Sequence, residues 1–195
     1  TYSSITAQEI ASEKGTKIME IIFSSTTATS YFVGKIAGIM LVILTQIGIY
    51  LLGGWAGYSI AVNNAALKPL LADNQALING VIHNLFNINL LFLFLGVVIY
   101  TILAAYSGAL VAKAEDASKA AQPVVMLSML AFFAAFPFQN NLDALAVKIL
   151  SYIPFFSSYF MPMRIINNTA NWGEQLISLT ILLATIGLFA LYVGR

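Results

Sequence analysis

Ionisable side chains are scarce in this chain, and they are concentrated near its start. The whole sequence holds nine Lys or Arg, eight Asp or Glu and one His. Five of these residues, Glu13, Lys14, Lys17, Glu20 and Lys35, lie within ASEKGTKIMEIIFSSTTATSYFVGKIAG, residues 11–38. Such a charged segment in an apolar chain indicates a surface that meets water or another protein.

Several kinds of site chemistry are excluded by residue type. The chain has no cysteine, which excludes disulfides, thiolate metal ligands and cysteine nucleophiles. His83 is the only histidine, so a histidine metal cluster cannot form, and zinc hydrolysis is disfavoured by ligand count. No Gly-x4-Gly-Lys-Ser/Thr loop for nucleotide phosphates occurs. We therefore expect no catalytic residue, no metal site and no cofactor bound by this chain.

The composition is that of a membrane protein. The chain is 59% hydrophobic and 9% charged, whereas soluble domains carry about 25% charged residues. The net charge of +1 gives no indication of nucleic-acid binding. We expect an all-α integral membrane protein with the lipid bilayer as its solvent. The start, TYSSITAQEI, lacks a Met and a leader pattern, which favours an internal or C-terminal piece of a longer polypeptide.

Charge-free stretches predict four membrane-spanning helices. They lie at about 31–54, 84–107, 121–138 and 175–193. With a cytoplasmic N-terminus, the inner side would hold Lys14, Lys17, Lys35, Lys113, Lys119 and Arg195, and the outer side Lys68, Lys148 and Arg164. This excess of inner basic residues favours that orientation. The prediction divides the chain into a cytoplasmic coupling-helix region, 1–30, and a transmembrane domain, 31–195.

Residues 141–166 predict a helical hairpin on the outer side. Asn141 or Asp143 would cap a short helix that Pro154 stops, and Ser157 or Ser158 would begin a second one. The hairpin could be re-entrant or could lie flat on the outer leaflet. It is aromatic, apolar and too broken to span, so we expect it to close the outer end of a pathway. Arg164 follows Met163 at a depth where it could reach headgroups or a cavity. The predicted gate residues are Pro154, Phe155, Phe156 and Tyr159.

The segment from Ala7 to Ser24 predicts an amphipathic helix. Its apolar residues, Ala7, Ile10, Ala11, Ile18, Ile21 and Ile22, fall in one sector of a helical wheel, and Glu9, Glu13, Thr16, Lys17 and Glu20 in another. Glu13 and Lys17 are predicted to form an i,i+4 pair. Gly15 predicts a bend followed by a short helix to Phe23, and SSTTATS offers caps for the first span. The helix could rest on the inner leaflet, but three acids on its polar face favour a protein partner over anionic lipid.

Small and amide side chains mark possible packing or pathway positions. Gly34, Gly38, Thr45 and Gly48 share one face of the first span, and Gly34-x3-Gly38 permits close helix approach. This face could pack within the chain, or form a dimer or pathway surface. Asn84 and Asn87 share a face at the outer start of the second span, where a pathway and interhelical hydrogen bonding are both open. His83 beside them could hydrogen-bond at a helix start or contact a substrate.

Three segments resemble one family of membrane proteins. EKGTKIMEIIFSSTTATSYFVGKIAGI resembles the cytoplasmic coupling region of ABC transporter permeases of type 2, and looks most like their sodium-export branch. YTILAAYSGALVAKAEDASKAAQP and LSYIPFFSSYFMPMRI resemble later segments of the same permeases, in the same order. The family normally has six spans with a large outer domain between the first two. The four spans predicted here suggest its C-terminal membrane portion or a divergent permease half.

The resemblance implies a function in transport. A separate nucleotide-binding subunit would bind ATP and Mg and hydrolyse the ATP, and the coupling residues would dock on it: Glu13, Lys14, Gly15, Thr16, Lys17, Met19 and Glu20. The permease would act in the cell membrane as a homodimer or a pair and export a solute. Sodium rests on the resemblance alone, because no predicted span carries a carboxylate. A membrane scaffold and a secondary carrier are the alternatives, although a carrier should show buried ionisable residues or inverted repeats.

Overall fold

The computed structural model describes residues 2–16, 18–64, 67–85, 87–111 and 113–193, and within them the regular structure is entirely helical. This confirms the all-α fold class. The helices are α1 (Tyr2–Gly15), α2 (Ile18–Phe23), α3 (Ala28–Asn63), α4 (Lys68–Asp73), α5 (Gln75–Leu85), α6 (Ile88–Leu110), α7 (Ala114–Ala135), the 3-10 helix η1 (Phe136–Phe138), α8 (Leu145–Leu150), α9 (Pro154–Ile166) and α10 (Trp172–Val193).

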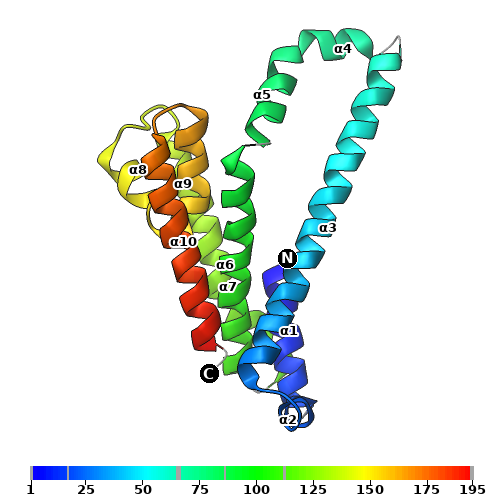
Figure 1. Ribbon diagram of the computed structural model, residues 1–195, viewed down its shortest axis with the longest axis vertical. Helices are drawn as coiled ribbons and strands as arrows, with labels where there is room; N and C mark the ends of the chain where they lie inside the picture. Colours follow the sequence, from blue (N-terminus) through cyan, green and yellow to red (C-terminus); the bar gives the residue numbers. More distant parts are fainter. Residues whose placement is uncertain (1, 17, 65–66, 86, 112, 194–195) are drawn as a thin grey trace.

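The helix α6 runs through the middle of a bundle. The helices α1, α7, α9 and α10 all pack against it, and the first part of α3 also contacts α6 and α10. The rest of α3 diverges from the bundle and is joined to α6 through α4 and α5 (Figure 1). The helix α2 lies at one end of the molecule, and α4, α5, α8 and the start of α10 lie at the other. We call these the α2 end and the hairpin end.

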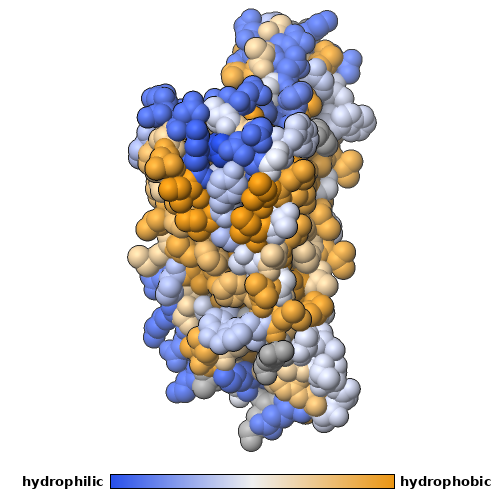
Figure 2. All heavy atoms as spheres, turned by 60° about the vertical axis from the view of Figure 1, so that its left-hand side comes forward, coloured by the Kyte–Doolittle hydropathy of each residue, from blue (hydrophilic) through white to orange (hydrophobic). Residues whose placement is uncertain are grey.

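Four of the described helices are long and apolar enough to span a membrane. They cover Ala28–Asn63, Ile88–Leu110, Glu115–Phe138 and Trp172–Tyr192. Hydrophobic side chains form a broad band between two more polar ends of the molecule (Figure 2). A helix satisfies its backbone hydrogen bonds internally, which is what the bilayer interior demands. The prediction of four apolar helices of spanning length is therefore confirmed.

Local capping chemistry explains where three of these helices begin. Thr27 caps α3, its side chain accepting a hydrogen bond from the Ser30 amide at 3.2 Å, as the SSTTATS segment predicted. Asn87 caps α6 by accepting from the Ile88 amide at 2.7 Å, so this helix begins at Ile88 rather than 84. The helix α7 begins at Ala114 rather than 121, since Glu115 and Asp116 suit the positive end of the helix dipole.

The outer connection departs from its predicted capping. Neither Asn141 nor Asp143 caps α8, because the cap position is Ala144, which makes no side-chain hydrogen bond. The second helix begins at Pro154 rather than at Ser157 or Ser158. The fixed backbone angle and missing N–H of proline suit the first position of a helix, so this residue begins α9.

Two glycines of α6 let neighbouring helices approach it closely. A Cβ atom built on Gly96 would lie 2.5 Å from the Cβ of Ser158 in α9. One built on Gly108 would lie 2.5 Å from the carbonyl oxygen and 2.7 Å from the Cα of Ala7 in α1. Both distances are far below van der Waals contact, so only glycine fits these crossings. At Gly108 the neighbour is backbone, which cannot rotate away.

We expect Gly108→Ala to destabilise the bundle, because overpacking typically costs about 1–3 kcal/mol. The matched control is Gly48→Ala, where no atom lies within 4 Å of the added Cβ and helix propensity should improve. The measurement is the thermal unfolding midpoint of both variants purified in one detergent. Equal midpoints would show that α1 and α6 do not cross as closely as described.

Candidate functional site

The helix α1 inserts a face of small residues between α6 and α7. Ala7, Ile10 and Ala11 are each completely buried. Gly108 permits this approach, since the α1 backbone at Ala7 lies directly against it. The first helix therefore belongs to the bundle and does not lie loosely on its surface.

The helix α2 leaves the bundle in a new direction. The predicted bend near Gly15 and the short helix ending at Phe23 are confirmed. The prediction that Ile18 and Ile21 share one apolar face with the buried residues of α1 is wrong, because they are 46% and 72% exposed. The break between α1 and α2 interrupts the helical periodicity, so each helix presents its own face.

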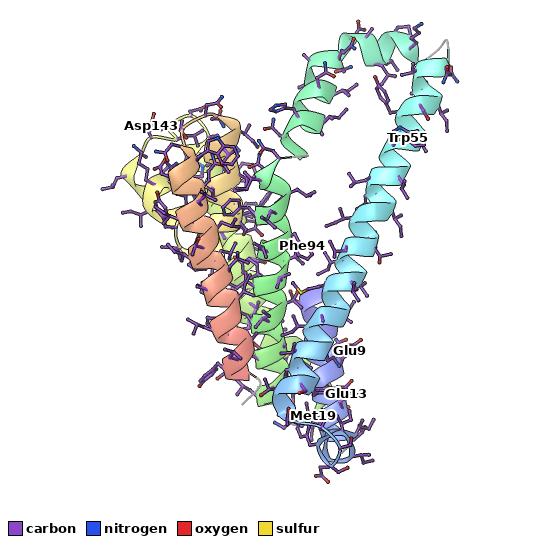
Figure 3. All side chains as sticks on the ribbon, in the orientation of Figure 1. Glu9, Glu13, Met19, Trp55, Phe94 and Asp143 are labelled. Atoms are coloured by element: carbon purple, nitrogen blue, oxygen red, sulfur yellow. The ribbon has the colours of Figure 1, made fainter. Side chains whose placement is uncertain are left out.

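A shared lysine ties α1 to the start of α3. Lys35 Nζ lies 2.7 Å from Glu13 Oε1 and 3.4 Å from Glu9 Oε2, and the lysine side chain is 12% exposed. The two carboxylates lie on α1 beside α3 (Figure 3). Glu13 was predicted to pair with Lys17, which lies outside the described residues. Its observed partner comes from another helix, which no local spacing rule could supply.

The other predicted coupling residues divide into inward and outward groups. Lys14 Nζ donates to the carbonyl oxygen of Ala109 at 2.6 Å, at the negative end of α6. Thr16 follows Gly15, the last residue of α1, and its hydroxyl donates to the Ser12 carbonyl oxygen at 2.8 Å. Met19 packs against the core between α1, α3 and α6. Glu20 is exposed.

The outward surface of α2 is apolar as well as acidic. Ile18, Ile21 and Phe23 are 46%, 72% and 40% exposed, and none of the six residues of α2 is buried. The helix is closed by Ser24 and Ser25, whose hydroxyls donate to the carbonyl oxygens of Ile21 and Ile22. We call α2 with residues 24–27 the elbow. Exposed apolar side chains around a single carboxylate are typical of a protein-binding surface.

The glycine face of α3 meets no other helix in the part of the chain that the structure describes. No atom outside the local backbone of α3 lies within 4 Å of a Cβ built on Gly34, Gly38 or Gly48. The printed hydrogen bond of Thr45 stays within its own helix, at the Leu41 carbonyl oxygen. Gly34 and Gly38 line an open groove of about 580 Å³ between α1 and α3. Close packing within the chain is therefore not observed at these glycines, and a dimer or pathway surface stays a prediction.

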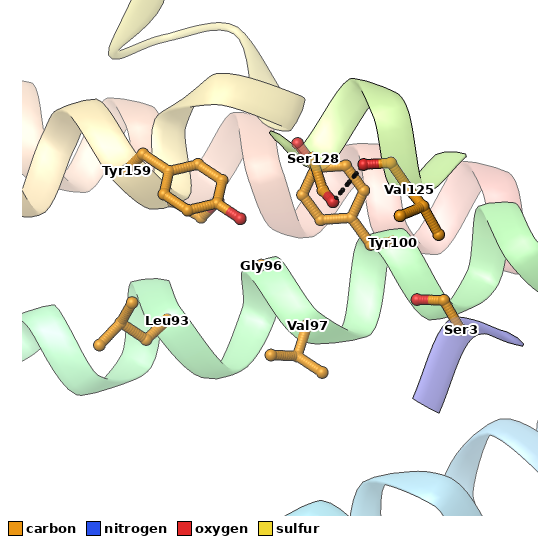
Figure 4. A pocket seen from close by; sticks show the side chains of 9 residues that line it. Ser3, Leu93, Gly96, Val97, Tyr100, Val125, Ser128 and Tyr159 are labelled. Carbon is orange, nitrogen blue, oxygen red and sulfur yellow. Dashed lines mark hydrogen bonds between the residues drawn. The ribbon is translucent and has the colours of Figure 1, made fainter. Parts of the chain in front are cut away.

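A pocket of about 410 Å³ lies among α1, α6, α7 and α9 (Figure 4). Its walls combine apolar side chains of α6 and α7 with five hydroxyl-bearing residues, namely Ser3, Tyr100, Ser128, Ser158 and Tyr159. The Ser158 hydroxyl is buried and makes no hydrogen bond with any described residue. We call this the hydroxyl pocket. It offers an apolar space with a few polar groups, which is the usual character of a small-molecule site.

Sequence reasoning missed most of the hydroxyl pocket. Ser3, Tyr100, Ser128 and Ser158 come from four different helices, and no spacing in the sequence relates them. Tyr159 was predicted as a gate residue, and Ser158 only as a possible helix start. Small hydroxyl residues in apolar helices were the available signal, but they are common in membrane helices as packing residues.

The predicted gate residues hold α9 to the bundle through separate contacts. The Tyr100 hydroxyl donates to the Phe155 carbonyl oxygen at 2.5 Å, and the Phe155 ring also meets Phe189 of α10. Phe156 packs on Phe160 in α9, and Tyr159 packs edge-on against Phe132 of α7. Pro154 begins α9. Their role as a gate stays a prediction.

A buried arginine fixes the turn between α9 and α10. Arg164 is fully buried, although the sequence suggested that it reaches headgroups or a cavity. One guanidinium nitrogen donates to the Ser151 hydroxyl at 2.9 Å. The other donates to the Thr169 carbonyl oxygen at 2.9 Å and to Glu174 Oε1 at 2.8 Å. The Tyr152 hydroxyl donates to the same carboxylate oxygen at 3.3 Å. These bonds join α8, α9 and α10, and no charge-spacing rule predicted them.

The two asparagines predicted at the second span also take structural roles. The Asn84 amide donates to the Gly80 carbonyl oxygen at 2.8 Å, while Asn87 caps α6. Both line a polar pocket together with His83, which lies in the last turn of α5 rather than at a helix start.

Comparison with known proteins decides the family. Residues 1–193 match the family described as "ABC-2 family transporter protein". The chain belongs to the ABC-2 transporter family. An ABC-2 permease is a membrane transport component, which agrees with four apolar helices and a multi-pass membrane setting.

Two curated relatives of this ABC-2 chain are themselves uncharacterised. It is 28% identical to the protein YhaP of Bacillus subtilis (strain 168) over 194 residues, 100% of this chain and 46% of the relative. It is 27% identical to the protein MJ1024 of Methanocaldococcus jannaschii over 186 residues, 95% of this chain and 42% of the relative. The chain thus spans less than half the length of either relative. No solved structure matches it.

We expect Glu174→Ala to destabilise the protein strongly, because removing one partner of a buried ion pair typically costs about 3–5 kcal/mol. Combining it with Arg164→Met should cost less than the sum of the two single changes. The exposed pair of Lys148 and Asp143, 3.8 Å apart, supplies the control. There Asp143→Asn should cost less than about 1 kcal/mol. Thermal unfolding midpoints in detergent provide the measurement, and a Glu174→Ala midpoint equal to that of Asp143→Asn would refute the network.

Proposed function

We propose that this chain is part of the permease of an ABC exporter, which moves a solute across the cell membrane using ATP hydrolysis on a separate nucleotide-binding subunit. The ABC-2 membership supports a permease with an ABC ATPase partner. The observation that carries the proposal is the exposed apolar elbow, built on two helices that enter the bundle. ATP and Mg belong to the partner, since the chain carries no phosphate-binding loop.

The elbow has the connections that a mechanical coupler needs. A force on α2 reaches α1, which is wedged between α6 and α7, and reaches α3 through the ion pair of Lys35 with Glu13. Lys14 adds a direct bond to the end of α6. Closure of a partner at α2 can therefore shift several spans together, as rigid elements with two packings would do.

The hydroxyl pocket supports a solute with an apolar body and hydrogen-bonding groups. Its volume of about 410 Å³ exceeds the space of one dehydrated ion, and its polar groups are neutral hydroxyls. Hard cations prefer several oxygen ligands, often with a carboxylate. Sodium export is accordingly the part of the proposal that rests on sequence resemblance alone. The aromatic residues of α9 would close the hairpin end of the path, as Tyr159 lies in the pocket wall.

A second permease copy or a paired permease would complete the transporter. The glycine face of α3 is the surface in this chain that suits close helix approach, because Gly34, Gly38 and Gly48 have open space around them.

Basic residues favour the α2 end as the cytoplasmic one. Lys14, Lys35 and Lys119 belong to helix segments at that end. Lys35 at the α2 end and Arg164 at the hairpin end are both largely buried in ion pairs. The basic residues that remain accessible are Lys14, Lys113 and Lys119 at the α2 end, and Lys68 and Lys148 at the hairpin end. The excess of basic residues at the α2 end favours it as the cytoplasmic one.

Single cysteines can test this orientation, since the chain has none of its own. Ser24 and Ser118 should react with a membrane-impermeant thiol reagent from the cytoplasmic side, and Asn74 and Asn168 from the outside. All four positions are exposed. Labelling of Asn74 and Ser118 from the same side would overturn the four-span topology.

Docking on the elbow can be tested with Glu20→Lys combined with Ile21→Asp. These changes reverse the charge and remove an apolar contact without touching the buried residues of α1. We expect loss of co-purification with the cognate ATPase subunit and loss of coupled ATP hydrolysis, with membrane insertion unchanged.

The matched control is Asp73→Lys, an exposed charge reversal in α4 at the hairpin end. It should leave co-purification intact. Normal yield of the complex and normal coupled hydrolysis in the Glu20 and Ile21 variant would exclude the elbow as the ATPase-binding surface.

A further inference from the structure

A second pocket, of about 470 Å³, lies at the hairpin end between the α5–α6 joint and the α9–α10 turn. Its polar lining consists almost entirely of carboxamides. The residues used here are His83, Asn84, Asn87, Asn168, Asn171 and Gln175. We call this the amide pocket. Two stretches of the chain that lie far apart in the sequence, 83–87 and 165–175, contribute to it, so it is a product of the fold and not of one polar segment.

The hydrogen bonds already made define what the amide pocket still offers. Asn87 and Asn171 use their carbonyl oxygens to accept from the amides of Ile88 and Glu174, so their amino groups stay available. Asn84 and Gln175 use their amino groups to donate to backbone carbonyls, so their oxygens stay available. Within the described residues the pocket therefore presents both donors and acceptors.

Gln175 provides the most telling of these groups. It is 7% exposed, and its side-chain oxygen accepts no hydrogen bond from any described residue. That oxygen is not among the fully buried atoms that lack a partner, so it is accessible at the pocket wall. An accessible oxygen in the wall of a pocket is a place for a ligand donor.

The amide pocket is electrically neutral in its described lining. It contains no Lys, Arg, Asp or Glu, and His83 is its only titratable side chain. Glu174 nearby has both oxygens committed, one to Arg164 and the other to the Asn171 amide. A divalent cation would want carboxylate oxygens and a phosphate would want guanidinium groups. The chemistry therefore fits an uncharged ligand that carries donors and acceptors together.

We propose that the amide pocket binds a carbohydrate. Each sugar hydroxyl both donates and accepts, which matches a lining that offers amino groups and carbonyl oxygens together. Trp172 also lines the pocket, is 68% exposed, and offers an apolar face for the ring. The sugar can come from solution or from the headgroup of a glycolipid, since the pocket lies beyond the apolar band. This site goes beyond the proposed export function and does not depend on the ATPase partner.

The test uses the full chain in nanodiscs with two probes. One is maltose in solution, measured by titration calorimetry. The other is a monoglucosyl diacylglycerol in the nanodisc lipid, counted by native mass spectrometry. The variant is His83→Ala with Asn168→Gly. Asn168 has a φ of 56°, and glycine adopts this left-handed conformation freely, so the backbone should persist while the carboxamide is lost.

The matched control is Asn167→Ala, at the neighbouring asparagine, whose amide bonds the Met163 carbonyl oxygen outside the pocket. We expect saturable binding of maltose, of the glycolipid or of both, weakened at least tenfold in the double variant and unchanged in the control. Maltose binding identifies a soluble sugar, and retention of the glycolipid alone identifies a headgroup.

Three results would overturn the proposal. Neither probe binds the unmodified chain, the double variant binds as well as the control, or inorganic phosphate displaces the bound probe. The last outcome would identify an anion site instead. Thermal unfolding midpoints equal to that of the unmodified chain ensure that loss of binding is not loss of fold.

Discussion

The close burial of α6 is the constraint on which the rest of the structure depends. This helix is mostly apolar, and its neighbours α1, α7, α9 and α10 bury 61% of its most apolar window in place of lipid. Gly96 and Gly108, three turns apart, admit α9 near one end and α1 near the other. The helix α9 of the hairpin and the helix α1 that leads to the elbow thus pack against the same helix. A change in the tilt of α6 would therefore displace structure at both ends of the molecule.

The two least exposed basic residues among the ion pairs join separate helices. Lys35 connects α3 to α1 through two carboxylates, and Arg164 connects α9 to the start of α10 through Glu174. Ion pairs of this kind are weak sources of stability, because desolvation offsets most of the attraction. They do fix which helix meets which. In a bilayer, where apolar faces hardly discriminate among partners, such polar contacts supply the specificity.

The features that could be predicted from the sequence are the local ones. Four apolar stretches, the break at Gly15 and the cap at Thr27 follow from composition and from residues adjacent in the chain. The predicted starts of two helices were less accurate. The helix α6 begins later than predicted, after its cap Asn87, and α7 begins earlier, with acidic residues in its first turn. The three-segment resemblance also placed the chain correctly among ABC-2 transporters, while its sodium-export branch stays a prediction.

The candidate sites were mostly beyond prediction because they join distant residues. The hydroxyl pocket takes Ser3, Ser128 and Ser158 from three helices, and the partner of Glu13 is 22 positions away. Arg164 was predicted to reach headgroups or a cavity because no acidic residue lies near it in the sequence. In the structure it pairs with Glu174, which lies beyond the α9–α10 turn. Apolar periodicity failed at Ile18 and Ile21, since a helical wheel assumes a continuous helix.

The length of α3 makes the molecule responsive to the thickness of its bilayer. At 1.5 Å per residue its 36 residues extend about 54 Å, against a hydrocarbon core of about 30 Å. Beyond Ile43 none of its described residues is buried by the rest of the chain, so contacts within the chain constrain the inclination of this part only weakly. A thinner membrane would lay the helix over, and a thicker one would raise it. That movement would be carried by α4 and α5 to Asn87, the residue that starts the central helix. The physical state of the lipid is therefore an input to this fold in its own right.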